Sequence, residues 1–167
     1  MKVVVTGSTG LVGEALVTAL QAGGHSVVRL VRSSPNPAEH RYAWNPDTGS
    51  IDAAALSGCD GVVHLAGENV AGGRWSDARK ARIRESRVAG TELLVRELLK
   101  LDAPPKVLLS ASAVGFYGDR GDELLDEGSA CGEGFLAEVA RDWEAATREA
   151  QDHDVRVAHL RFGVVLS

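Results

Sequence analysis

Short apolar runs alternate along this chain with longer segments in which apolar positions recur every three or four residues. The first run, residues 2–6, is rich in valine and ends at a glycine, which predicts a strand buried on both faces. In residues 11–22 the apolar positions fall on one helical face, and Gly23 and Gly24 then end the helix. The chain therefore opens with a strand, a glycine-containing turn and an amphipathic helix.

The same alternation continues to the end of the sequence. We expect further strands at 26–31, 41–44, 61–65, 107–110 and 155–161, and further helices at 75–101 and 136–150. Strands that alternate with helices predict an α/β fold, with right-handed crossovers between parallel strands. We therefore predict a Rossmann-type doubly wound parallel sheet with helices on both faces, and 167 residues suit one domain.

Composition and charge exclude several classes of protein. Hydrophobic residues make up 44% and charged residues 25%, which is typical of a globular domain and not of a disordered chain. The net charge of −5 argues against a nucleic-acid partner. No apolar run reaches the 18 or so residues of a membrane span, and the N-terminus does not have the pattern of a secretory signal. We expect no membrane association.

The cysteines and histidines offer no metal or disulfide pattern. Cys59 and Cys131 lack C-x-x-C spacing, and we expect them to be reduced thiols in a cytoplasmic protein. The five histidines show no i, i+4 pair and no cysteine partner, so no metal site is predicted.

Glycine is more frequent than in an average protein, with 19 of 167 residues against a usual share of about 7%. Three of these glycines follow the first strand. Glycines spaced three apart at a strand-to-helix turn allow a sharp bend, close approach of the backbone to a pyrophosphate, and tight packing of helix on strand. The helix N-terminus then favours the anion. The alternative is a tight turn without a ligand. The predicted phosphate-binding residues are Gly7, Ser8, Thr9, Gly10, Leu11, Val12 and Gly13.

The residues at the end of the second strand indicate whether a dinucleotide site prefers NADP or NAD. An NAD site places Asp or Glu there to accept from the ribose 2′-hydroxyl, whereas this chain has Val31 followed by Arg32. A guanidinium cannot accept a hydrogen bond but pairs well with a 2′-phosphate. The sequence therefore favours NADP over NAD, and the alternative is a solvated arginine at a strand end.

Further motifs resemble the extended and atypical branch of the short-chain dehydrogenase/reductase superfamily. A G-x-x-G-x-x-G loop, H-L-A-G at 64–67, G-T at 90–91 and S-x-S at 110–112 near Y-G at 117–118 all match that branch. More narrowly, the chain is similar to an epimerase-like subfamily, usually described as nucleotide-sugar epimerase-like, through G-E-N at 67–69, G-R-W at 73–75 and R-F-G-V-V-L at 161–166.

The resemblance implies more of the cofactor site and the extent of the chain. It places Leu65, Ala66, Gly67, Arg87 and Val165 near the cofactor, and it makes a homodimer through the helices at 75–101 and 135–150 plausible. Members of the family continue for about as many residues again, adding a C-terminal lobe that recognises a small-molecule substrate. We therefore expect residues 1–167 to be the NAD(P)-binding Rossmann domain of a longer protein, truncated before that lobe.

The acid/base pair of most superfamily members is missing. Those enzymes use Tyr-x-x-x-Lys, where the lysine lowers the pKa of the tyrosine. Here the residues four positions after Tyr42 and Tyr117 are Pro46 and Gly121. The resemblance leaves Ser112, in the position of the superfamily's substrate-binding Ser/Thr, and Tyr117 as catalytic candidates.

Each candidate also has an ordinary structural interpretation. The Ser112 hydroxyl could cap the following turn, and Tyr117 could serve only in packing beside Phe116. Glu68 follows the H-L-A-G strand and could act as an acid/base or merely brace the loop.

Two functions follow from these observations. The first is an NADP-binding oxidoreductase or epimerase-like enzyme that acts on a nucleotide-sugar-like or other carbonyl- or hydroxyl-bearing substrate. The second is a non-catalytic NADP-binding regulatory module, which the missing Tyr/Lys pair favours. A truncated domain without activity of its own is a third interpretation.

Overall fold

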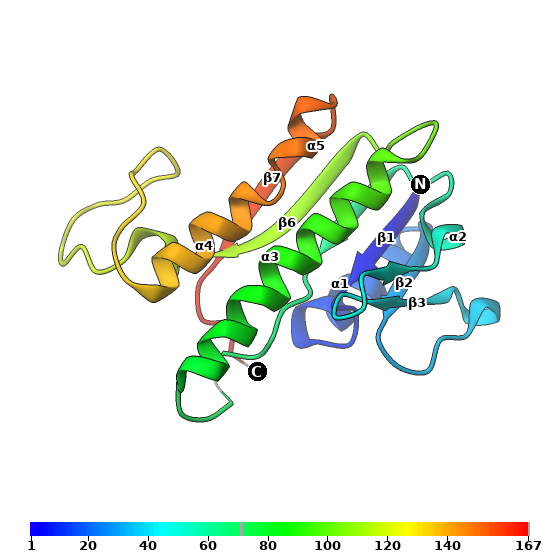
Figure 1. The fold of residues 1–167 in the computed structure, drawn as a ribbon. Helices are drawn as coiled ribbons and strands as arrows, with labels where there is room; N and C mark the ends of the chain where they lie inside the picture. The colour runs from blue at the N-terminus through cyan, green and yellow to red at the C-terminus, as the bar shows by residue number, and fades with distance from the viewer. Residues whose placement is uncertain (71, 167) are drawn as a thin grey trace.

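The computed structural model describes residues 1–70 and 72–166, and its centre is one seven-stranded sheet in the order β4-β3-β2-β1-β5-β6-β7 (Figure 1). All neighbouring strands are parallel except β3 and β4. The strand order reverses between β1 and β5, so the predicted Rossmann-type doubly wound sheet is confirmed. The strands are β1 (Lys2–Thr6), β2 (Ser26–Val31), β3 (Arg41–Asn45), β4 (Ser50–Ile51), β5 (Gly61–His64), β6 (Val107–Ala113) and β7 (Arg156–Phe162).

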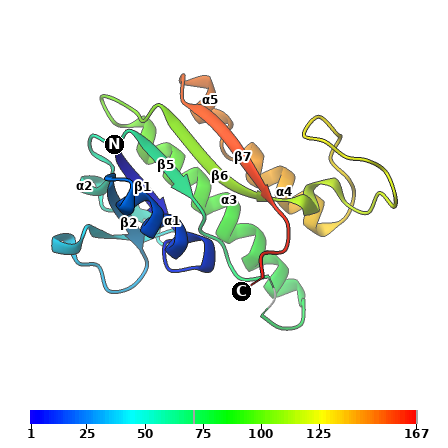
Figure 2. The same cartoon turned by 180° about the vertical axis from the view of Figure 1, so that it is seen from behind.

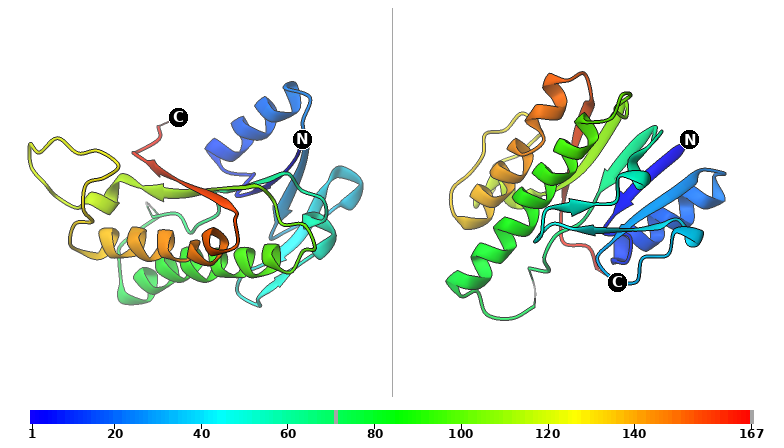
Figure 3. Two further views of the ribbon diagram at one scale, coloured as in Figure 1. Left: turned by 90° about the horizontal axis from the view of Figure 1, so that it is seen from above. Right: turned by 45° about the vertical axis from the view of Figure 1, so that its right-hand side comes forward.

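Helices cover the sheet on both faces, as Figures 2 and 3 show: α1 lies on one face, and α3 and α4 lie side by side on the other. The helices are α1 (Leu11–Ala22), α2 (Ala53–Leu56), α3 (Asp77–Leu99), α4 (Phe135–Ala145) and α5 (Arg148–Asp152), with 3₁₀ turns η1 (Pro37–Glu39) and η2 (Val114–Tyr117).

Alternating strand residues build a core on each face. On the α1 face, Val5 and Val27 pack with Val17 of the helix, and on the α3 face the larger cluster includes Leu30 and Leu94. Fully burying a Val or Leu side chain contributes about 1.5–3 kcal/mol, so both layers stabilise the sheet on which the loops are mounted.

The helix expected at 136–150 is divided into α4 and α5. The Thr147 hydroxyl donates to the carbonyl oxygen of Glu144 at 2.7 Å, and the Thr147 N–H reaches the same oxygen at 3.2 Å. A threonine that bonds back to the preceding turn competes with the helical pattern, so the break falls at Thr147. The apolar spacing of the segment continues across the break and could not reveal it.

Candidate functional site

The glycine loop after β1 is built so closely that two of its positions exclude a side chain. Gly7 has φ +65°, and a Cβ atom there would lie 2.7 Å from the carbonyl carbon of Leu65. A Cβ atom at Gly13 would collide with the carbonyl oxygen of Gly7. The loop therefore lies directly against the segment that follows β5, and α1 begins tightly behind it.

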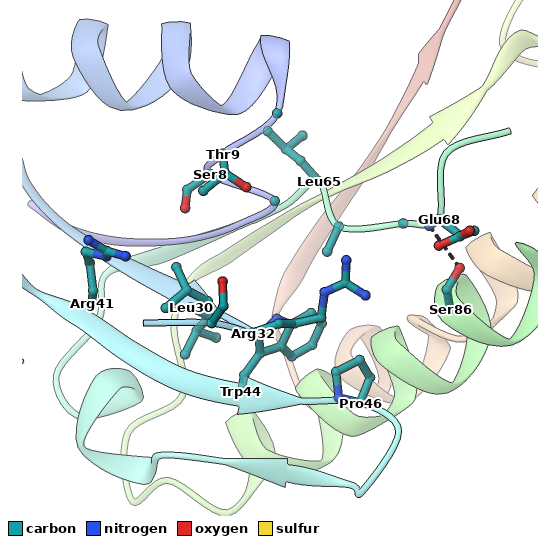
Figure 4. Close-up of a pocket in the computed structure, with 16 residues that line it drawn as sticks. Ser8, Thr9, Leu30, Arg32, Arg41, Trp44, Pro46, Leu65, Glu68 and Ser86 are labelled. Atoms are coloured by element: carbon teal, nitrogen blue, oxygen red, sulfur yellow. Dashed lines mark hydrogen bonds between the residues drawn. The ribbon is translucent and has the colours of Figure 1, made fainter. Parts of the chain in front are cut away.

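A cavity of about 330 Å³ opens beside this loop, across the carboxyl ends of β1, β2 and β5 (Figure 4). In a doubly wound sheet this edge, at the point where strand order reverses, is where ligands bind. The cavity brings together nine residues that the sequence predicts for the cofactor: Gly7, Ser8, Thr9, Gly10, Val31, Arg32, Leu65, Ala66 and Gly67.

The other five predicted cofactor residues do not line this cavity. Leu11 and Val12 are in the exposed or half-buried first turn of α1, and Gly13 is buried behind Gly7. Arg87 lies on α3 behind the 67–68 segment, and Val165 lies half-exposed beyond β7. Their roles toward a cofactor stay predictions.

The lining also includes residues that sequence reasoning did not place at a cofactor site. Strand pairing brings β3 beside β2, with Val31 opposite Ala43, so the next residues of both strands border the same space. The missed residues of β2, β3 and their following turns are Leu30, Ser33, Arg41, Trp44 and Pro46, and Ser86 reaches the lining from α3. Glu68 had been considered only for the loop and for acid/base chemistry.

Two polar groups of the cavity lack partners within the described part of the chain. The Ser8 hydroxyl oxygen is buried without a hydrogen bond, and the exposed Arg32 guanidinium forms no hydrogen bond or ion pair with residues 1–70 and 72–166. The helix N-cap, Gly10, supplies no side-chain cap to the first turn of α1. Unpaired donors at a helix N-terminus suit an anion, so the residues present fit the phosphates of a dinucleotide.

A buried hydrogen-bond chain supports the floor of the site. The Thr6 hydroxyl oxygen accepts from two backbone N–H groups just after β5, at 3.1 and 3.2 Å, and therefore donates to Nδ1 of His64 at 2.7 Å. His64 Nε2 lies 3.0 Å from the Thr91 hydroxyl, which donates to the carbonyl oxygen of Arg87 at 2.6 Å. This pattern assigns the His64 proton to Nε2. Burial lowers the pKa of His64 to about 4, so the imidazole is neutral.

Arg87, on α3, supports the backbone of the segment that follows β5 and lines the cavity. Its guanidinium donates to the carbonyl oxygens of Glu68 at 3.1 Å and Ile83 at 3.0 Å, and it lies 5.0 Å from the centre of the Trp143 ring. Burial lowers the pKa of Arg87, although the Glu68 carboxylate opposes this shift. The Glu68 N–H also donates to the Ser86 hydroxyl at 3.0 Å. Glu68 is thus fixed through its backbone, which fits the bracing interpretation.

The two catalytic candidates meet through one ion pair. The buried Ser112 hydroxyl donates to Glu144 Oε1 at 2.6 Å, and Arg161 donates to both carboxylate oxygens of Glu144 at 2.8 and 2.9 Å. Arg161 also donates to the Tyr117 hydroxyl oxygen at 2.8 Å. Its guanidinium lies 3.7 Å from the centre of the Phe116 ring. Ser112 and Tyr117 are therefore parts of one polar network between β6, β7 and α4.

Charge and burial set the ionisation of this network. Burial opposes ionisation of the Glu144 carboxyl, but hydrogen bonds from Arg161 and Ser112 outweigh it and lower the pKa of Glu144. The same carboxylate raises the pKa of Arg161. The pair is thus fully charged at neutral pH.

A second cavity, of about 540 Å³, borders this network, and Tyr117, His159 and Arg161 are among its lining residues. Ser112 lines neither cavity. The structure thus separates the candidate catalytic groups from the glycine-loop cavity.

Residues 1–70 and 72–166 contain neither a metal-binding cluster nor a helix that could span a membrane. There, no three His, Cys, Asp or Glu side chains gather in a way that could hold a metal ion. No helix in this part of the chain has the length and apolar character needed to cross a membrane.

Comparison with known proteins agrees with this fold. The profile of the NAD dependent epimerase/dehydratase family matches residues 3–160. An epimerase family protein of Mycobacterium bovis, Mb2239, is 47% identical over 165 residues, which are 99% of this chain and 54% of the relative. The chain thus spans about half the length of the curated relatives it matches.

Two solved structures have the same fold over the whole chain. The crystal structure of a nucleoside-diphosphate sugar epimerase from Corynebacterium glutamicum has a TM-score of 0.86 at 48% identity, covering 100% of this chain and 34% of that one. The human epimerase family protein SDR39U1, crystallised with NADPH, has a TM-score of 0.86 at 34% identity and covers 100% and 55%.

Proposed function

The chain belongs to the NAD dependent epimerase/dehydratase family, and from this premise we propose that it binds NADP as the cofactor-binding part of an enzyme of the short-chain dehydrogenase/reductase type. The observation that carries the proposal is the unpaired Arg32 guanidinium in the lining of the glycine-loop cavity. In this proposal residues 1–167 form the dinucleotide-binding domain, of which Ala71 and Ser167 lie outside the described residues.

The phosphates of the dinucleotide have clear partners in this proposal. Gly7, Gly10 and the start of α1 hold the pyrophosphate, and the buried Ser8 hydroxyl supplies a hydrogen bond. Arg32 pairs with the 2′-phosphate, because the end of β2 has no carboxylate to accept from a ribose hydroxyl. The NADPH in the human relative supports NADP over NAD for this chain.

In this proposal the nicotinamide end of the dinucleotide extends toward β6 and β7. When bound, the nicotinamide supplies hydride transfer to or from a carbon that bears oxygen. Tyr117 accepts a hydrogen bond from Arg161 and keeps its own O–H free to donate to a substrate oxygen. Ser112, whose proton is directed to Glu144, can accept a hydrogen bond from a substrate hydroxyl. We therefore propose Ser112 and Tyr117 as catalytic residues: Tyr117 lines the second cavity, and the buried Ser112 reaches a substrate oxygen only if the network around Glu144 opens when substrate binds.

The substrate class follows from the family and from this chemistry. A nucleotide-sugar-like molecule, or another carbonyl- or hydroxyl-bearing small molecule, is the proposed substrate, as the name of the Corynebacterium relative suggests. We further propose a cytoplasmic protein that forms a homodimer through α3 and α4, which lie side by side on one face of the sheet.

A second candidate function is a non-catalytic NADP-binding regulatory module. The observation that favours it is that both candidate hydroxyl groups already have protein partners, since Ser112 donates to Glu144 and the Tyr117 oxygen accepts from Arg161. Tyr117 also lacks the lysine partner four residues later that enzymes of this superfamily use, because Gly121 occupies that position.

Binding and turnover measurements separate the two functions. The chain is first titrated with NADPH and NADH, following the fluorescence of the reduced nicotinamide. A longer protein that contains the chain is then assayed for cofactor oxidation with carbonyl compounds and for interconversion of nucleotide sugars. Turnover that Tyr117→Phe abolishes supports the enzyme, and tight NADPH binding without any turnover supports the regulatory module.

A further inference from the structure

We propose that Arg41 is a second specificity-determining cation, which binds the 2′-phosphate of NADP together with Arg32. This inference rests on the proposed function, since it concerns the same cofactor site. Arg41 is nine positions beyond Arg32 in the sequence, and nothing in its surroundings there marks it as a cofactor residue.

Strand pairing brings Arg41 to the cavity. It is the first residue of β3, where it pairs with Arg29 of β2. Its neighbours in the strand, Tyr42 and then Trp44, belong to the core on the α3 face. Because strand side chains alternate between faces, Arg41 is directed to the other face, which carries α1 and the glycine loop.

Both arginines line the glycine-loop cavity, and they reach it from different sides. In Figure 4, Arg41 lies on the side of Ser8 and Thr9, whereas Arg32 extends from the end of β2 toward Leu65. The two side chains thus border the space between the glycine loop and the neighbouring strands β2 and β3. This is the space in which the adenosine ribose of a Rossmann-bound dinucleotide lies.

The described residues balance the two positive charges at this end of the cavity only in part. Arg32 has no ion pair among the described residues, and the side chain of Arg41 has only an exposed contact of 3.4 Å with Glu39. Among the described lining residues Glu68 is the one that carries a carboxylate, and it lies across the cavity, beside Ser86 (Figure 4). Two cations that share a cavity repel each other, so an anion between them would be strongly favoured.

The anion that fits is a phosphate monoester. Each guanidinium offers five N–H donors in a planar fork that matches phosphate oxygens. The Ser33 hydroxyl adds a donor in the same lining. A neutral ribose 2′-hydroxyl needs an acceptor, which neither arginine provides. The pair Arg32 and Arg41 therefore distinguishes a 2′-phosphorylated adenosine from an unphosphorylated one.

The test measures dissociation constants of four probes: NADPH, NADH, adenosine 2′,5′-bisphosphate and 5′-AMP. Arg41→Met should weaken NADPH and the bisphosphate about tenfold or more, because a hydrogen bond to a charged group contributes about 1.5–3 kcal/mol. NADH and 5′-AMP should change less than about twofold. Arg29→Met is the matched control, since Arg29 pairs with Arg41 in register but does not line the cavity, and it should leave all four values unchanged.

The outcomes separate this inference from the proposed function. If Arg41→Met keeps the wild-type preference for NADPH while Arg32→Met loses it, the role of Arg41 is overturned and NADP binding stands. If the wild-type protein binds NADH as tightly as NADPH, both proposals fail. Retained 5′-AMP binding shows that the variant is folded. Should Arg41→Met not fold, Arg41→Lys and Arg41→Gln give the same comparison, with the larger loss of NADPH affinity expected for Gln.

Discussion

The Thr6 hydroxyl lies 2.7 Å from Nδ1 of His64, and this contact joins the two central strands between which the strand order reverses. Both side chains are completely buried. The same hydroxyl accepts from the backbone at the start of the segment that lines the cavity, so the geometry of the candidate site depends on a neutral imidazole below it.

We predict that protonation of His64 destabilises the fold. The unfolded chain takes up this proton near pH 6.5, whereas the folded protein resists it until about pH 4. The unfolded state therefore binds more protons between these values, and stability falls as the pH falls from 6.5 to 4, by about 3 kcal/mol in total.

Urea unfolding at a series of pH values measures this fall. His64→Leu should lack this part of the pH dependence, although it is less stable throughout. His153→Gln, which alters an exposed histidine, should keep the wild-type pH dependence. A wild-type stability that is flat between pH 6.5 and 4 would contradict the assignment.

Gly13→Ala should damage the fold and the phosphate loop together. The new methyl group would meet the carbonyl oxygen of Gly7, which is backbone and cannot turn aside. Overpacking of this kind costs about 1–3 kcal/mol. Gly163→Ala is the control, because a Cβ atom at Gly163 meets nothing within 4 Å. Denaturant unfolding gives the stability, and equal effects of the two substitutions would show that the close packing of Gly13 is unimportant.

The Glu144–Arg161 pair should contribute far more than the Arg84–Asp142 pair that links α3 to α4. The Glu144 side chain is only 11% exposed, so Arg161→Met leaves a buried carboxylate without its cation, which costs about 3–5 kcal/mol. Arg84 is 50% exposed, and Asp142, which is 19% exposed, keeps its contact with Arg141, so Arg84→Met should cost less, about 1 kcal/mol. Thermal and urea unfolding of both variants test this order, and similar losses for the two would refute it.

The sequence predicted the parts of the site that are local to one strand end. Glycines at fixed spacing mark the phosphate turn, and Arg32 follows its strand directly, so each signal lies within a few residues. The sequence did not predict Arg41 as a site residue, because only the pairing of β2 with β3 brings it to the cavity. The contact of Glu144 with Arg161 likewise joins residues 17 apart, on a helix and a strand.

The missed elements of the fold have equally simple causes. Strand β4 has two residues and helix α2 has four, which is too short for any hydrophobic period to show. The 136–150 helix is divided at Thr147, whose hydroxyl donates to the carbonyl oxygen of Glu144. The sequence does not show which acceptor this hydroxyl bonds in the folded protein.

We propose that Arg32 makes this chain an NADP-binding protein, and the most direct test is the ratio of its affinities for NADPH and NADH before and after Arg32→Met. We predict that the wild-type protein binds NADPH at least about tenfold more tightly than NADH, and that the variant loses this preference through weaker NADPH binding alone. Equal affinities in the wild type, or a preference that survives Arg32→Met, would contradict the account.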